Sequence, residues 1–124
     1  MLGVGATVKA ACEAAALLRT EGCDLTVVNM RFIKPLDEEL LRELAEDHDL
    51  LITAEENVDC GGIGEAVRRF ISENDLPIRV LTAAVPDAYM RYGTVDSQRR
   101  RAGLDPESLI RKIREEAVRQ GISF

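Results

Sequence analysis

The sequence predicts an α/β fold, a three-layer domain in which a mostly parallel sheet carries helices on both faces. Short apolar runs alternate along the chain with segments whose apolar residues recur every three to four positions. Around residues 50–70 the pattern changes from a continuous run to the helical period at a glycine-rich turn, as a buried strand followed by a helix requires. Strands that alternate with helices are joined by right-handed crossovers and therefore lie parallel.

The expected elements follow in order. Strands are predicted at residues 1–4, 25–29, 50–54 and 78–81, and helices begin near residues 7, 38, 63, 95 and 106. The helix starts carry residues that cap free backbone N–H groups, namely Asp37, Thr94 and Asp105. Glycines suited to the left-handed conformation follow helix ends at Gly22 and Gly103. Residues 82–93 hold both tyrosines and are expected to form an extended surface loop.

Helix periodicity also predicts which side chains are buried. The first helix is expected to bury Val8, Ala11, Cys12, Ala15 and Leu18. The second helix is expected to turn Leu40, Leu41 and Leu44 inward, and the last one Leu109, Ile110, Ile113 and Ala117.

Composition limits the class of protein. A chain of 124 residues with 46% hydrophobic and 31% charged residues is expected to form one folded domain, residues 1–124. Because a strand begins at once, the domain is predicted to be cut from a longer chain. The net charge of −6 disfavours nucleic acids and anionic membranes as partners, with the run 99–101 as the one basic exception. No apolar run approaches ~20 residues, and a cytoplasmic location is expected.

Cysteine and histidine usage gives no metal or disulfide signal. Three cysteines, Cys12, Cys23 and Cys60, form no C-x-x-C pair and are expected to be buried or partly buried free thiols. The only histidine, His48, lies near the end of an acidic helix, where it can meet the negative end of the helix dipole. That structural role is favoured over catalysis.

The polar residues after the central strand are the candidate functional site. Glu55, Glu56 and Asn57 end the strand, and Gly61-Gly62 opens the next helix. The glycine turn is open to two interpretations: exposed N–H groups that bind an anion, or a tight turn with close helix packing. The second is favoured, because the spacing matches no phosphate-loop motif and the neighbouring carboxylates repel phosphate.

The same residues do not form a catalytic pair. Neighbouring residues on a strand point to opposite faces, so Glu55 and Glu56 cannot share a proton. No catalytic, cofactor-binding or metal-binding residue is predicted. Instead the five residues Glu55, Glu56, Asn57, Gly61 and Gly62 are predicted to form a protein interface.

Four motifs resemble a known family. They are Asn29-Met30-Arg31-Phe32-Ile33-Lys34-Pro35-Leu36-Asp37, Glu55-Glu56-Asn57 with Gly61-Gly62-x-Gly64, Val85-Pro86-Asp87, and Gly103-Leu104-Asp105. In this order the series resembles the carboxyl-terminal domain of transketolase-type thiamine diphosphate enzymes, and among them the 1-deoxy-D-xylulose-5-phosphate synthases. Transketolases and the beta subunits of 2-oxoacid dehydrogenases, which share part of the series, are the alternatives.

The resemblance implies a five-stranded, mainly parallel sheet and a non-catalytic domain that supports a homodimer. It implies that thiamine diphosphate and magnesium are bound by other domains of the parent enzyme, which condenses pyruvate with glyceraldehyde 3-phosphate for isoprenoid precursor synthesis. At Arg91-Tyr92-Gly93 the chain departs from the family, which often has a histidine just before this glycine. Two other classes stay open: a stand-alone small-ligand or anion-binding module, and a protein-docking domain.

Overall fold

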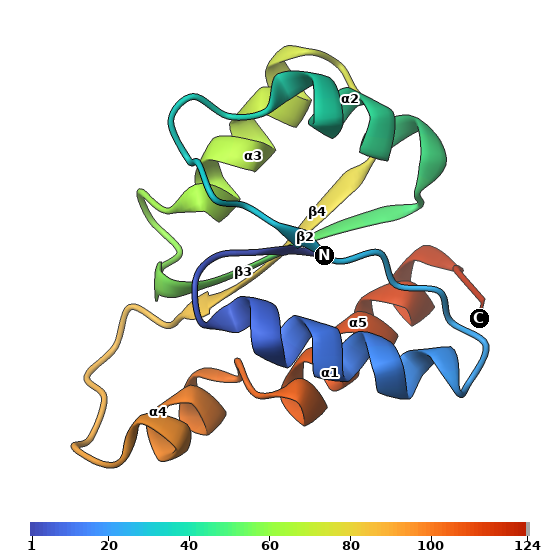
Figure 1. Ribbon diagram of the computed structural model, residues 1–124. Helices are drawn as coiled ribbons and strands as arrows, with labels where there is room; N and C mark the ends of the chain where they lie inside the picture. The colour runs from blue at the N-terminus through green and yellow to red at the C-terminus, as the bar shows by residue number, and fades with distance from the viewer. Residues whose placement is uncertain (124) are drawn as a thin grey trace.

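The computed structural model describes residues 1–123 and shows a parallel sheet between two layers of helices (Figure 1). The strands are β1 (Leu2–Gly3), β2 (Val28–Asn29), β3 (Leu50–Val58) and β4 (Arg79–Val85). The helices are α1 (Thr7–Arg19), α2 (Glu38–Asp47), α3 (Ile63–Glu73), α4 (Val95–Ala102) and α5 (Pro106–Gln120). The strand order is β2-β1-β3-β4, and each neighbouring pair is parallel. The three-layer α/β prediction is confirmed with four strands, and residues 1–123 contain no fifth strand of the kind that the resemblance implied.

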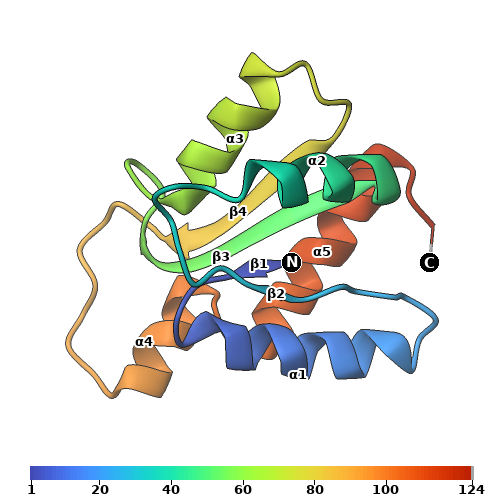
Figure 2. The ribbon, with the colours of Figure 1, turned by 45° about the horizontal axis from the view of Figure 1, so that its top comes forward.

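The two helical layers cover opposite faces of the sheet. Helices α2 and α3 lie on one face, and α1, α4 and α5 lie on the other (Figures 1 and 2). Side chains of β3 alternate between these layers, so that Leu51 packs under α2 and α3 while Ile52 packs toward α1 and α5. Both faces of the strand are therefore buried, which explains its continuous apolar run.

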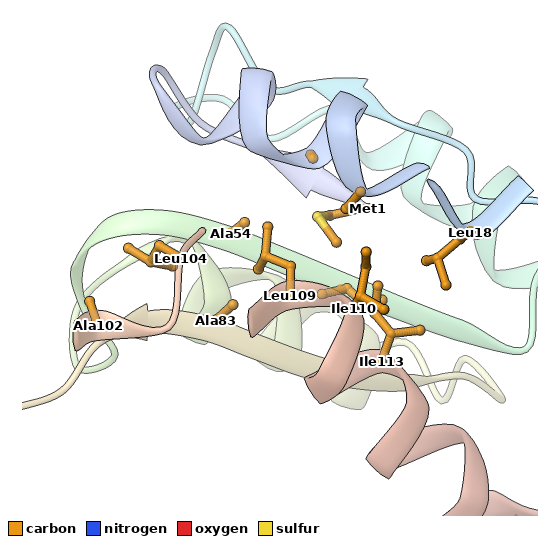
Figure 3. Packing of buried hydrophobic residues seen from close by; sticks show 12 residues of the cluster. Met1, Leu18, Ala54, Ala83, Ala102, Leu104, Leu109, Ile110 and Ile113 are labelled. Carbon is orange, nitrogen blue, oxygen red and sulfur yellow. The ribbon is translucent and has the colours of Figure 1, made fainter. Parts of the chain in front are cut away.

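The core on the α1 and α5 side joins both ends of the chain. Met1 from the first strand region, Leu18 of α1 and Ile113 of α5 belong to one buried cluster (Figure 3). Small residues of the sheet, Ala54 and Ala83, lie beneath them and let the helices pack close to the strands. Segments far apart in sequence thus hold the same layer together.

All four strands differ in their boundaries from the predicted ranges, including β3, which continues to Val58 and does not end at residue 54. Only Val28–Asn29 of the run 25–29 is a strand, because β1, its one neighbour in the sheet, offers only two residues for pairing. In contrast, β4 continues to Val85, since β3 remains alongside it as far as the pair Val58 and Val85. The predicted loop at 82–93 is therefore wrong in its first part and begins at Pro86.

The helix starts agree with the sequence-based prediction more closely than the strand boundaries do. Asp37 accepts a hydrogen bond from the Leu40 N–H at 3.1 Å, and Asp105 accepts one from the Ser108 N–H at 3.2 Å. The Thr94 hydroxyl accepts from the Ser97 N–H in the same way, at 3.2 Å. These caps confirm three predicted helix starts.

Helix α1 buries a different face from the predicted one, which included Cys12. The buried residues of that helix are Thr7, Ala11, Ala14 and Leu18. Cys12 is exposed, as is Cys60, and only Cys23 is partly buried. The buried stripe is rotated from the predicted one, and Thr7 at its start donates to the Ala54 carbonyl at 2.7 Å.

Candidate functional site at the carboxyl end of β3

The five predicted interface residues divide into an interior and an exterior set. Glu55 is fully buried, whereas its neighbours Glu56 and Asn57 are exposed. Gly61 is exposed and Gly62 is half-buried in the turn that leads into α3. The prediction that Glu55 and Glu56 point to opposite sides of the strand is therefore confirmed.

Glu55 binds the amino terminus of α3. One carboxylate oxygen accepts the Ile63 N–H at 2.9 Å, and the other accepts the Gly64 N–H at 2.9 Å. These two N–H groups have no partner inside the helix, and the positive end of the helix dipole favours a negative charge there. The anion at this helix terminus is thus a side chain of the same protein.

The glycines make room for this contact. A Cβ at Gly62 would lie 2.6 Å from the carboxyl carbon of Glu55, and a Cβ at Gly64 would lie 2.7 Å from the Thr82 hydroxyl oxygen. Gly61 has a φ of +79°, which side chains rarely tolerate. A tight turn with close packing is therefore confirmed as the role of these glycines.

Glu56 contacts a helix from the other layer. Its carboxylate accepts the Arg99 Nε–H at 2.5 Å, and this hydrogen bond raises the pKa of the Arg99 guanidinium. Arg99 belongs to the basic run 99–101. The pair joins the end of β3 to α4 across the carboxyl edge of the sheet.

Arg68 and Thr82 also hold the turn in place, although sequence reasoning did not select them. One Arg68 nitrogen donates to the Thr82 hydroxyl at 2.7 Å, and the other donates to the Asp59 carboxylate at 2.9 Å. Arg68 lies four residues after Gly64 and so shares its helix face. From that spacing the sequence could have predicted that the Arg68 side chain contacts the glycine turn.

The arrangement offers little for catalysis. The buried carboxylate already has two donors, and the exposed one is paired with an arginine. Among residues 1–123 no cluster of three or more His, Cys, Asp or Glu side chains is placed to hold a metal ion. His48 lies at the end of α2, where its Nε2 is 3.1 Å from the Thr26 hydroxyl.

No helix within the described part of the chain is long and apolar enough to cross a bilayer.

Comparison with known proteins identifies the family. The family described as "Transketolase, C-terminal domain" matches residues 1–109. The 1-deoxy-D-xylulose-5-phosphate synthase of Thioalkalivibrio sulfidiphilus is 45% identical over 81% of this chain and 16% of its own length. The enzyme of that name from Aquifex aeolicus is 39% identical over 93% of this chain and 18% of its own length. The chain therefore spans less than a fifth of these curated relatives.

A solved structure supports the same assignment. It is described as a split gene transketolase, inactive beta4 tetramer, and it superposes with a TM-score of 0.82 at 32% identity. The match covers 92% of this chain and 36% of that one. The motifs, the parallel sheet and the sequence matches agree, and the chain belongs to the transketolase C-terminal domain family.

Proposed function

We propose that this chain is the non-catalytic C-terminal domain of an enzyme like 1-deoxy-D-xylulose-5-phosphate synthase, and that it supports that enzyme's homodimer. Its similarity to synthases over most of its own length supports this assignment. The parent enzyme would condense pyruvate with glyceraldehyde 3-phosphate in the cytoplasm. Its thiamine diphosphate and magnesium would be bound by other domains.

The observation that carries the non-catalytic role is the contact between Glu55 and α3. A helix amino terminus can bind a diphosphate through its free N–H groups, and here a carboxylate already accepts the Ile63 and Gly64 N–H groups of α3. A second anion would be repelled by that charge. The residues present therefore do not fit a diphosphate or its magnesium, and they disfavour a stand-alone anion-binding module.

We assign the dimer contact to the exposed part of the predicted interface. Asn57 and Gly61 face solvent at the turn, and Glu56 is exposed beside its ion-pair partner Arg99, so all three are accessible to arginine or amide groups of a partner. Glu55 and Gly62 contribute from inside, because they fix the turn against α3. In this proposal three of the five residues contact the partner, and the other two hold the turn in position.

Transketolase itself is the second candidate for the parent enzyme. The split gene transketolase supports it, at 32% identity and a TM-score of 0.82. The synthases match this chain at higher identity, 45% and 39%, and they are therefore preferred. A gene for an acyltransferase next to this one would instead favour a 2-oxoacid dehydrogenase beta subunit.

Isothermal titration calorimetry tests the role of the chain. Thiamine diphosphate titrated into the chain in excess magnesium should give no binding heat. The same titration into the complete parent enzyme should give a stoichiometric isotherm. A stoichiometric isotherm with the chain alone would contradict the proposal.

A further inference from the structure

The loop between β4 and α4, residues 86–94, exposes two tyrosines almost completely. The exposed fraction is 93% for Tyr89 and 96% for Tyr92, and Val95 beside them is 59% exposed. We call this loop the tyrosine arm; it extends from the carboxyl edge of the sheet (Figures 1 and 2). Tyrosine provides a large contact area at low conformational cost and is enriched at protein interfaces.

The tyrosine arm is fixed to the domain at its centre and at its end. Met90, which lies between the tyrosines, packs against the core on the α1 and α5 side. An Arg101 guanidinium N–H donates to the Arg91 carbonyl at 3.1 Å, and Thr94 caps α4. An arm held in this way presents its side chains without a large entropic cost on binding.

A groove runs beside the arm. Its volume is about 510 Å³, and its lining is mostly apolar, with Val85, Met90, Val95, Ala102 and Leu104. The ion pair of Glu56 and Arg99 forms part of the same lining. An apolar side chain from a partner would fit between the arm and α4, with polar groups around it.

The charge of this region indicates the kind of partner. The chain has a net charge of −6, but three arginines of this region, Arg91, Arg100 and Arg101, form no ion pair with residues 1–123. Contact between two copies of the same surface would bring these like charges together. An acidic surface is complementary, because it would form ion pairs with these guanidinium groups.

We infer that the tyrosine arm docks onto an acidic, partly apolar surface of the polypeptide that completes the parent enzyme. The inference rests on the proposed function. This chain corresponds to only 16–18% of its synthase relatives, so more than four-fifths of such an enzyme is available to supply the partner surface.

Sedimentation velocity tests the inference. The chain is mixed with the polypeptide from the same organism that carries the thiamine diphosphate domains, and the dissociation constant is measured at low and moderate salt. Loss of a central tyrosine typically weakens binding about 30-fold, so Tyr89→Ser and Tyr92→Ser should each do so. Arg91→Glu should weaken binding about tenfold or more, chiefly at low salt.

Matched controls lie on α5, away from the arm. Val118 is 80% exposed and Arg111 is also exposed. Arg111→Glu therefore repeats the charge reversal elsewhere, and Val118→Ser removes an exposed apolar side chain elsewhere. Both controls should leave the dissociation constant unchanged. The melting temperatures of all variants, measured by circular dichroism, should equal that of the unsubstituted chain, since none of these side chains is buried.

The outcomes separate the two proposals. If the unsubstituted chain binds and the arm variants bind equally well, the docking role is wrong while the proposed function stands. If the unsubstituted chain does not bind at all, the docking inference is wrong, and the calorimetric titration decides separately whether the proposed function stands. If the chain instead forms homo-oligomers that the tyrosine substitutions dissociate, the assigned partner is wrong.

Discussion

The two edges of the sheet bury charge in different ways. At the carboxyl edge, the Glu55 carboxylate has two N–H donors and the positive end of a helix dipole. At the amino edge, the Met1 amine is buried with the Thr26 carbonyl as its partner, and burial lowers its pKa from 8.0 to about 6. The carboxylate has two backbone donors and a helix dipole, whereas the amine has a single carbonyl acceptor, and its burial favours the neutral form.

The largest expected effect comes from removing the carboxylate. Glu55→Ala would leave the buried Ile63 and Gly64 N–H groups without an acceptor, at a cost of about 3–5 kcal/mol in the free energy of unfolding. Gly62→Ala should cost a similar amount, because its methyl group displaces the same carboxylate. Urea denaturation measures both changes.

A double variant and a neighbouring control sharpen this test. Glu55→Ala with Gly62→Ala should cost much less than the sum of the two single changes, since both remove one contact. Glu56→Ala, which removes an exposed ion pair, should cost about 1 kcal/mol or less. Strict additivity would show that Gly62 acts independently of Glu55.

The second prediction concerns pH at the amino edge. The Met1 amine takes up a proton near pH 8 when unfolded but near pH 6 when folded, so between these values the unfolded state binds more protons. Stability should therefore be highest above pH 8 and fall by about 2–3 kcal/mol as the pH drops through 6. Denaturation at pH 6 and 8 measures the change, and Nα-acetylation should abolish it. An equal slope in the acetylated chain would assign the effect to another group.

The third prediction concerns a capped helix start at the same edge as Glu55. Asp37→Ala should cost about 0.5–2 kcal/mol, because the Leu40 N–H loses its side-chain acceptor. Chemical denaturation measures the loss. Asp37→Asn keeps a capping oxygen and should recover most of it, so equal losses for Ala and Asn would exclude a capping role.

The smallest effect should be a gain in stability. Thr53 is fully buried, and its hydroxyl has no hydrogen-bond partner among residues 1–123. Thr53→Val removes this unpaired group and should stabilise the domain by about 1 kcal/mol, measured as a raised urea midpoint. Thr7→Val is the control: the Thr7 hydroxyl donates to Ala54 and accepts from Val4, so the same change should destabilise. A loss for Thr53→Val would indicate a partner such as buried water.

The sequence by itself determined the order and type of the elements and the family. Apolar periods, capping residues and glycines act over a few positions, so the helix starts at Asp37, Thr94 and Asp105 could be predicted. The family motifs are equally local. The opposite orientations of Glu55 and Glu56 followed from the alternation of side chains along a strand.

Only the tertiary structure decided which groups meet across the chain. The lengths of β2 and β4 depend on how far a neighbouring strand runs beside them, which their own residues do not encode. The identity of the anion at α3 depends on a contact eight residues away through a folded turn. The inward orientation of Thr7 at the start of α1 depends on a bond to Ala54, 47 residues later. Each outcome rests on a contact between separate segments, and such contacts form only when the chain has folded.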